Sequence, residues 1–328
     1  MKTILFLLII IFSNILLFAQ PSFTTIPGTD GLSKATAYQI WTKEHLMELG
    51  DSINNAYYPN YSTWHFDKHF CLMQDINDSL THSIGGGFKG HFHGSGKKIT
   101  IERNYIYNPY EAPAIFGGLD LEGTIDSLTI DGYCENCMSV ITDYNHSSSK
   151  ITNCINNATA NTYSFGSMSF QNIGGTISNC INNGDITGVD NVGGIAGQNI
   201  GSGQITNCIN TGKITATNSG SELTGGGDYI WGVGGIAAST GGNILNCINL
   251  GTVEGQRNVG GIVGMASGSI HFPPLSIINC VNYGYIKGTN AVGGIVGISY
   301  NNIPIISNCV NAGVVEGDSD VGSITGKE

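Results

Sequence analysis

Two histidines, His91 and His93, are the first side chains in this 328-residue chain whose spacing could support chemistry. Side chains two residues apart on a strand share one face, so this pair could bind a metal ion. A third ligand is not visible nearby in the sequence, and histidines on the surface of an edge strand are common. We therefore expect no metal site and no cofactor.

Aromatic side chains that could stack on a sugar ring occur in two segments that interrupt a repeat. Tyr229 and Trp231 lie in an insertion at about residues 217–231, and His271 and Phe272 lie in a second insertion at about residues 267–275. Insertions in repeat proteins often form the binding face. These four residues are our candidate ligand contacts. The alternative is that each loop folds its aromatic side chains over the coil beneath it.

A catalytic constellation is not evident in the sequence. The His-Glu-x-x-His pattern of zinc peptidases is absent, and the glycine-rich segments are typical of strands rather than of a nucleophile elbow. Paired carboxylates for glycoside hydrolysis could come from Asp185, Asp190, Asp228, Asp318 and Asp320. All five occupy predicted turns, where aspartate is expected in any case. We expect no catalytic residues.

The charge balance excludes one class of partner. The chain has 13 basic and 24 acidic side chains and a net charge of -11. Nucleic-acid phosphates require clustered Lys and Arg, so we expect no nucleic-acid binding.

Six of the nine cysteines occupy one position of a repeat, Asn-Cys-Ile/Val-Asn. The repeated cysteines are Cys154, Cys180, Cys208, Cys247, Cys280 and Cys309. An isoleucine precedes each of them by three residues, and a Val-Gly-Gly-Ile element or a close variant follows most units. A unit that recurs along the chain indicates a repeat architecture.

The spacing within the repeat predicts a parallel β-helix. If the isoleucine and the cysteine both face inward, their separation of three cannot be a straight strand, so the chain must bend between them. Asparagine tolerates the left-handed conformation that such corners use. Stacked units would bury their apolar sides together in a coil, expected to be right-handed. Equivalent residues would then form ladders of the six cysteines and of Asn182, Asn210, Asn249, Asn282 and Asn311.

The thiols of the ladder are expected to be free and buried. Stacked cysteines at the spacing of the turns lie within disulfide range, but side chains in register rarely reach the required torsion. Cys134 and Cys137 lie outside the repeated position, and a local disulfide between them is possible.

The chain divides into three parts. Residues 1–19 have the pattern of a signal peptide, with Lys2 before an apolar run, and the alternative is an uncleaved membrane anchor. Residues 20–110 form an N-terminal capping region with a helix at about 43–54, and residues 111–328 form the β-helix. The signal pattern predicts an exported protein, extracellular or on the cell surface, with the periplasm as the alternative. No second long apolar segment follows, so we expect no transmembrane span in the mature chain.

Residues 28–328 resemble the GLUG-motif repeats of bacterial secreted and surface proteins. The Gly-Gly-Ile-Val-Gly and Asn-Cys-Ile-Asn-x-Gly elements carry this resemblance, together with the segments around Gly28, Tyr38 and Phe88. The family commonly has Asp where His93 stands. The resemblance implies a β-helix found in adhesin-like proteins and as an accessory part of some large surface peptidases.

The sequence therefore predicts an all-β fold, a single-stranded parallel β-helix with one N-terminal capping helix. The predicted function is a non-catalytic, adhesin-like scaffold that binds glycan or surface protein. The alternative is a carbohydrate-active enzyme, a polysaccharide lyase or glycoside hydrolase, on the same fold. An open C-terminal end of the coil could accept a stacking partner.

Overall fold

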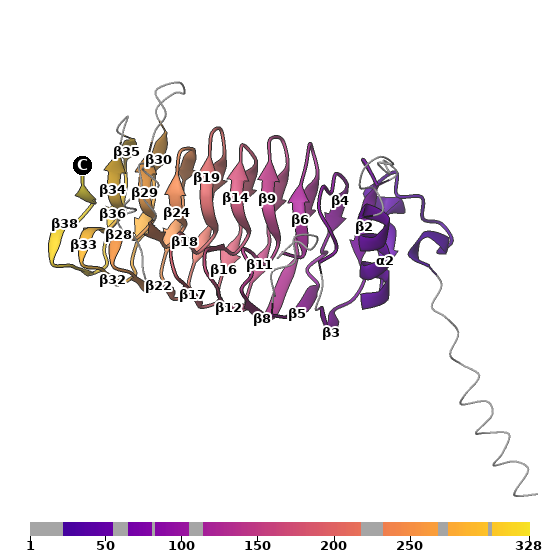
Figure 1. Ribbon diagram of the computed structural model, residues 1–328. Helices are drawn as coiled ribbons and strands as arrows, with labels where there is room; N and C mark the ends of the chain where they lie inside the picture. Colours follow the sequence, from indigo (N-terminus) through magenta and orange to yellow (C-terminus); the bar gives the residue numbers. More distant parts are fainter. Residues whose placement is uncertain are drawn as a thin grey trace, which may run out of the picture.

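The computed structural model describes residues 22–54, 65–80, 83–104, 114–217, 232–267, 275–300 and 304–328. These residues form a parallel β-solenoid of about 8 turns with a short helix near the N-terminus (Figure 1). The predicted parallel β-helix is confirmed. Its handedness and the domain boundaries stay predictions, and the signal segment 1–19 lies outside the described residues.

Four sheets run along the coil, and every ladder between named strands of the described residues is parallel. Sheet A consists of β1 (Tyr38–Ile40), β2 (His69–Leu72), β4 (His91–His93), β7 (Thr124–Asp126), β10 (Lys150–Thr152), β15 (Thr176–Ser178), β20 (Gln204–Thr206), β25 (Asn243–Leu245), β30 (Ser276–Ile278) and β35 (Ile305–Ser307).

Sheet B contains two strands from most turns. Its strands are β3 (Ile76–Leu80), β5 (Lys98–Asn104), β8 (Thr129–Glu135), β11 (Ile155–Asn156), β12 (Thr159–Asn161), β16 (Ile181–Asn182), β17 (Ile186–Gly188), β21 (Ile209–Asn210), β22 (Ile214–Ala216), β26 (Ile248–Asn249), β27 (Val253–Glu254), β31 (Val281–Asn282), β32 (Ile286–Lys287), β36 (Val310–Asn311) and β37 (Val315–Glu316).

Sheet C adds a strand to each turn from Phe116 onward, and sheet D adds one from Phe165 onward. Sheet C consists of β6 (Phe116–Leu119), β9 (Thr142–His146), β14 (Ser169–Ile173), β19 (Ala196–Ile200), β24 (Ala237–Thr240), β29 (Val263–Ser267), β34 (Val296–Tyr300) and β39 (Thr325–Lys327). Sheet D consists of β13 (Phe165–Gly166), β18 (Val192–Gly193), β23 (Val233–Gly234), β28 (Arg257–Gly260), β33 (Asn290–Gly293) and β38 (Ser319–Gly322).

The corner between sheets A and B explains the spacing of three in the repeat. Ile177 and Cys180 both face inward and are fully buried. Between them Asn179 has φ 55°, the left-handed conformation that lets the chain turn there. The other turns repeat this corner, with positive φ at Asn153, Asn207, Asn246, Asn279 and Asn308. Identical residues of neighbouring turns are therefore paired in register, such as Ile177 with Ile205.

The N-terminal end carries helix α2 (Lys43–Asn54) and two 3-10 helices, η1 (Phe23–Thr25) and η2 (Lys34–Thr36). The hydroxyl of Thr42 accepts a hydrogen bond from the backbone N–H of His45 at 3.3 Å, which satisfies one free donor of the first helical turn. Leu46, Leu49 and Ile53 form the buried stripe of α2. Figure 1 shows α2 at the N-terminal end of the coil, beside β2.

The last described turn has neighbours on one side only within the described residues. Its apolar side chains are correspondingly exposed, as at Ile305 (50%), Val310 (53%) and Val314 (61%). The stacking partner predicted for this end stays a prediction. No helix in the described parts of the chain has the length and apolar character needed to cross a membrane.

Candidate functional site

The predicted ligand contacts Tyr229, Trp231, His271 and Phe272 lie outside the described residues, so they stay predictions. The candidate site among the described residues is a cluster of histidines in the first turns of the coil.

Three histidines and an aspartate cluster on the outer face of sheet A, where β2, β4 and β7 pair. Phe92 is fully buried, so its neighbours His91 and His93 face outward. The register places His69 opposite His91 and Asp126 opposite His93. Three consecutive turns thus contribute to one cluster.

A chain of hydrogen bonds links His69, His93 and Asp126. Nδ1 of His93 lies 2.5 Å from Oδ2 of Asp126, and Nε2 of His93 lies 2.9 Å from Nδ1 of His69. A carboxylate can only accept, so Nδ1 of His93 donates to Asp126. Nε2 of a neutral His93 then accepts from Nδ1–H of His69. Nε2 of His69 is left with a lone pair at the outer end of the chain.

Burial and neighbouring groups keep the imidazoles of His69 and His91 neutral. Burial, and then the neighbouring histidines, lower the pKa of His69, and burial followed by His93 lowers the pKa of His91. Burial alone would raise the pKa of Asp126, but the hydrogen bond from His93 and its charge lower it below the usual value. At neutral pH the cluster therefore holds a charged Asp126 carboxylate near the neutral rings of His69 and His91, with Lys34 Nζ 3.9 Å from Asp126.

Chemically, this arrangement has the hydrogen-bond pattern of a proton relay. A carboxylate that orients an imidazole, which in turn contacts a further base, is the geometry of general acid–base catalysis. No group of three His, Cys, Asp or Glu side chains among the described residues is placed to hold a metal ion. The nitrogens of His69 and His93 face each other, and Nδ1 of His91 bonds to Oγ1 of Thr124 at 3.0 Å.

Sequence reasoning found His91 and His93 but missed the other two members. His69 and Asp126 lie 24 and 33 residues from His93. The available signal was the alignment of three short segments with an apolar middle residue: His-Phe-Cys, His-Phe-His and Thr-Ile-Asp. Their middle residues stack inside the coil, so the flanking side chains stack outside.

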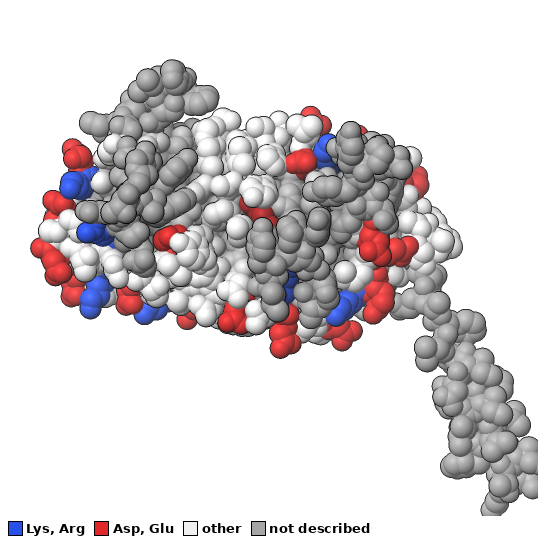
Figure 2. Space-filling view, viewed as in Figure 1, with Lys and Arg blue, Asp and Glu red and all other residues white. Residues whose placement is uncertain are grey.

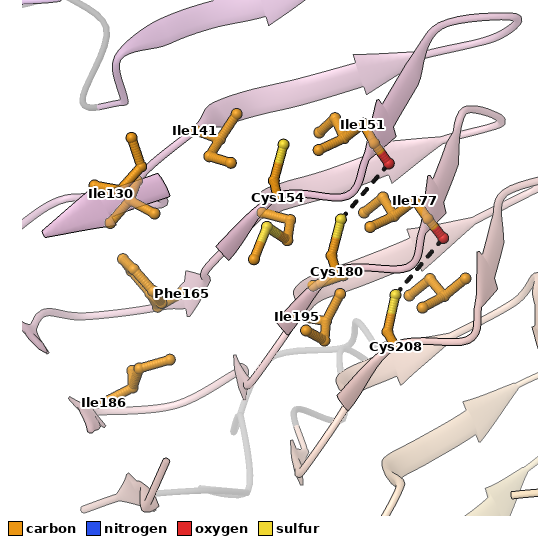
Figure 3. Packing of buried hydrophobic residues seen from close by; sticks show 14 of the residues in the cluster. Ile130, Ile141, Ile151, Cys154, Phe165, Ile177, Cys180, Ile186, Ile195 and Cys208 are labelled. Carbon is orange, nitrogen blue, oxygen red and sulfur yellow. Dashed lines mark hydrogen bonds between the residues drawn. The ribbon is translucent and has the colours of Figure 1, made fainter. Parts of the chain in front are cut away.

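The six repeated cysteines stack in one buried column of free thiols, half-buried only at Cys309. Figure 3 shows Cys154, Cys180 and Cys208 in line beside the isoleucines of sheet A. The thiol of Cys180 donates to the carbonyl of Ser178 at 3.3 Å and contacts that of Ile151 at 3.7 Å. Burial raises the pKa of Cys180 well above its usual value. Because five of the six thiols are fully buried, the column is an apolar element of the core.

The asparagines of sheet B form a second inner ladder. Nδ2 of Asn182 donates to Oδ1 of Asn210 at 2.7 Å and to the carbonyl of Gly184 at 2.9 Å. The same side-chain bond links Asn156, Asn182, Asn210, Asn249, Asn282 and Asn311 from turn to turn. Each amide thereby satisfies a buried polar corner of the coil.

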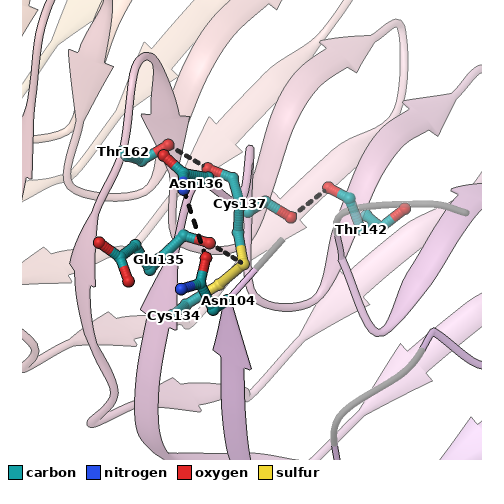
Figure 4. The surroundings of a disulfide bond; sticks show 8 residues. Asn104, Cys134, Glu135, Asn136, Cys137, Thr142 and Thr162 are labelled. Carbon is teal, nitrogen blue, oxygen red and sulfur yellow. Dashed lines mark hydrogen bonds between the residues drawn. A yellow bond between two sulfur atoms is a disulfide. The ribbon is translucent and has the colours of Figure 1, made fainter. Parts of the chain in front are cut away.

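Cys134 and Cys137 form a disulfide, with their Cα atoms 6.0 Å apart. Figure 4 shows it at the end of β8, where Thr162 of the next turn donates to the carbonyl of Cys137. A loop this short removes little entropy from the unfolded chain, so the bond fixes local geometry.

Three of the five carboxylates considered for glycoside hydrolysis make local contacts instead. Asp185 accepts from the backbone N–H of Lys213 at 2.7 Å, and Asp190 accepts from the hydroxyl of Ser164 at 2.9 Å. Asp320 pairs with Lys327 at 3.3 Å. Asp228 lies outside the described residues.

A match to a known repeat motif supports the repeat seen in the sequence. Residues 188–215, which run from β17 through β18, β19, β20 and β21 to β22, match the model of the GLUG motif. The chain contains a GLUG motif. The matched GLUG segment includes one complete turn of the coil, from the second strand of sheet B round to its equivalent on the next turn.

A solved structure has the same fold. The crystal structure of a protein from Bacteroides ovatus, described as a "putative immunoglobulin A1 protease", matches with a TM-score of 0.54 and 19% sequence identity. The match covers 93% of this chain and 91% of the other. At this identity the likeness establishes the fold alone. No curated protein is detectably similar in sequence.

Proposed function

We propose that this protein is an exported, adhesin-like scaffold that binds a glycan or a protein at or outside the cell surface. One observation supports it most. The strict register of the coil arranges outward side chains in straight lines from turn to turn. Glu254, Lys287 and Glu316 form one such line, and Gln171 and Gln198 are part of another.

Lines of this kind suit recognition of an extended ligand. Side chains on the outer face are held by strands that are hydrogen-bonded on both sides, so little conformational freedom is lost when a partner binds. Repeat proteins commonly use such long, regular surfaces for binding.

A glycan-array measurement on the purified protein tests the binding role. We expect binding to one class of glycan, reduced in the Tyr229→Ala/Trp231→Ala double variant if the inserted loop contributes. Tyr283→Ala is the matched control, because Tyr283 is 58% exposed and lies in a turn of the coil. Failure to bind any glycan, together with failure to bind cell surfaces, would contradict the proposal.

Export requires its own test. When the full chain is expressed in a bacterium, we expect it outside the cytoplasm with Gln20 as its first residue, as measured by mass spectrometry. A cytoplasmic product that keeps residues 1–19 would contradict export.

One observation favours catalysis as a second candidate function. The His69–His93–Asp126 chain ends in a lone pair on His69 Nε2 and is oriented by a carboxylate, as a general base requires. A carbohydrate-active enzyme built on this base would release reducing ends from a polysaccharide. His93→Asn would abolish that release while Tyr283→Ala, at an exposed residue outside both sites, would not. Absence of release from any polysaccharide that the protein binds would leave the scaffold role alone.

A further inference from the structure

We propose that the outer face of sheet C, over β9, β14 and β19, binds an extended, uncharged glycan chain that runs along the axis of the coil. The inference rests on the proposed binding function and names its site and ligand class. Figure 1 shows these three strands side by side, one from each of three successive turns.

A polar row crosses this face. Tyr144, Gln171 and Gln198 are register partners on β9, β14 and β19. Nε2 of Gln171 donates to Oε1 of Gln198 at 2.8 Å, which fixes the orientation of both amides. The ends of this bond are the amide oxygen of Gln171 and the amide NH2 of Gln198, an acceptor and a donor for sugar hydroxyl groups.

A second row, apolar at two of its three positions, lies beside the polar one, two residues further along each strand. It consists of His146, Ile173 and Ile200, again register partners. Ile200 is 38% exposed. A sugar ring has hydroxyl groups on its edge and C–H groups on its faces. Adjacent polar and apolar rows match those two surfaces.

Tyr144 forms a wall at one end of the rows. Its side chain is 39% exposed, and its ring is stacked with that of His146 at a centroid distance of 6.1 Å. Nε2 of His146 lies 3.4 Å from Oδ1 of Asp120. Gly118, the partner of Tyr144 on the preceding turn, has no side chain. Among the described residues, a Cβ there would meet only the backbone nitrogen of Gly87, at 3.5 Å. Because Gly118 has no side chain, no side chain of that residue covers the Tyr144 ring, against which a sugar can stack.

The spacing of side chains along each row matches the repeat length of a glycan chain. Successive turns of a parallel coil lie about 4.8 Å apart, close to the length of one pyranose unit along an extended chain. Consecutive sugar units can therefore meet Tyr144, Gln171 and Gln198 in turn. A ligand that runs across the turns uses the register that the repeat enforces.

The residues of the two rows favour an uncharged ligand. Neither row contains Lys, Arg, Asp or Glu. Figure 2 shows mostly white atoms in the middle of this view, with a few acidic side chains among them and more charged side chains toward the ends and lower edge. The carboxylate of Asp120 lies beside the face, against His146. Because the chain as a whole carries a net charge of -11, acidic polysaccharides are repelled. An uncharged glycan fits both features.

The test is titration calorimetry on the purified protein with defined hexasaccharides. The uncharged probes are cellohexaose, chitohexaose and mannohexaose, and the anionic probe is hexagalacturonate. We expect one uncharged probe to bind, more tightly than its disaccharide, and hexagalacturonate not to bind. Tyr144→Ala should weaken binding about tenfold, and Gln171→Ala/Gln198→Ala by a similar factor. Tyr283→Ala should leave it unchanged.

The results distinguish a failure of the sheet C site from a failure of the proposed binding function. Binding that survives both the Tyr144 and the Gln171/Gln198 changes would overturn this site while leaving the scaffold role intact. Preferential binding of hexagalacturonate would overturn the ligand class. If none of the four probes binds, the site proposal is wrong, and the glycan array decides whether the scaffold binds another glycan. Circular dichroism of each variant establishes that the coil is folded.

Discussion

His69 and His93 share a hydrogen bond of 2.9 Å between Nδ1 of the first and Nε2 of the second, across two turns of the coil. A neutral imidazole offers one donor and one acceptor, so the bond requires that at least one of these rings is neutral. When both are protonated, two N–H groups face each other and the contact becomes repulsive. The bond is therefore a proton-sensitive link between β2 and β4.

We predict that low pH decreases the free energy of unfolding because the histidines of this cluster become protonated. The pKa of His69 and that of His91 lie below their usual values in the folded chain, mainly because of burial. The stability contributed by the neutral rings is thus fully present above about pH 6.5. It is lost as the pH falls through the lower folded-state pKa values, because the unfolded chain then binds more protons. The charged groups around the rings are Lys34, Asp67, Glu122 and Asp126.

Denaturant unfolding at pH 7.5 and pH 5.0 measures the effect. The His69→Gln side chain retains an N–H donor for His93 but does not titrate. Between pH 7.5 and pH 5.0 the free energy of unfolding of this variant should therefore fall less than that of wild type, by about 1 kcal/mol, the net value of one hydrogen bond. His146→Gln, which changes an exposed histidine paired with Asp120, is the control. An identical pH dependence in wild type and His69→Gln would show that the link does not respond to protons.

Asp143 should have the opposite pH dependence. Burial raises its pKa to about 8, against the lowering effects of the Ala114 backbone N–H and of Arg103. Because the folded-state pKa exceeds the unfolded value of about 3.9, the stability is fully present below that value and is lost as the pH rises through about 8. Asp143→Asn keeps an oxygen for the Ala114 N–H and removes the buried charge.

We expect Asp143→Asn to be more stable than wild type at pH 9 by about 1–3 kcal/mol, the cost of a poorly paired buried polar group. At pH 4 the two proteins should be alike. Asp185→Asn serves as the control, because Asp185 contacts a backbone N–H at a turn. Equal stability of Asp143→Asn and wild type at pH 9 would mean that the carboxylate is fully paired when charged.

The fold was predictable because its determinants are local and repeated. Ile177, Asn179 and Cys180 encode an inward residue, a left-handed corner and a second inward residue, and the chain repeats this pattern at nearly every turn. The first turns do not follow the repeat closely. His69 and Asp126 meet His93 only through the register of strands whose sequences differ, so the pair His91 and His93 was visible without its partners.

The face of sheet C was hidden from sequence reasoning for a different reason. Gln171 and Gln198 look like ordinary surface residues until the register shows that they are opposite each other. Tyr144 has no aromatic counterpart on the next turns, so no repeat pattern marks it. Chemistry on the outer face depends on residues that vary between turns, whereas the inner face is fixed by residues that recur.

Thiol reactivity should separate the two kinds of free cysteine. Cys71 and Cys309 are half-buried, whereas the other five free cysteines are buried. A thiol-specific reagent should therefore modify up to two equivalents in the native protein and seven in denaturant without reductant, because Cys134 and Cys137 are paired. Rapid modification of Cys180 or Cys208 in the native protein, located by mass spectrometry, would show that the column opens.

The asparagine ladder should matter far more than its outward neighbours. Asn210 accepts from Asn182 at 2.7 Å and donates to Asn249 at 2.8 Å and to the carbonyl of Gly212 at 2.9 Å. Asn210→Ala removes all three bonds and leaves buried polar groups without partners, so we expect a loss of about 2–4 kcal/mol in the free energy of unfolding.

Asn183→Ala is the matched control for this change. Asn183 is exposed and its side chain bonds to Asn157 on the surface at 2.8 Å, so water can replace the lost partner and the expected effect is within about 0.5 kcal/mol. Denaturant unfolding of both variants at neutral pH measures the difference. Similar losses for the two would mean that the inner amides contribute no more than surface pairs. The register would then be held by the backbone ladders and the apolar core alone.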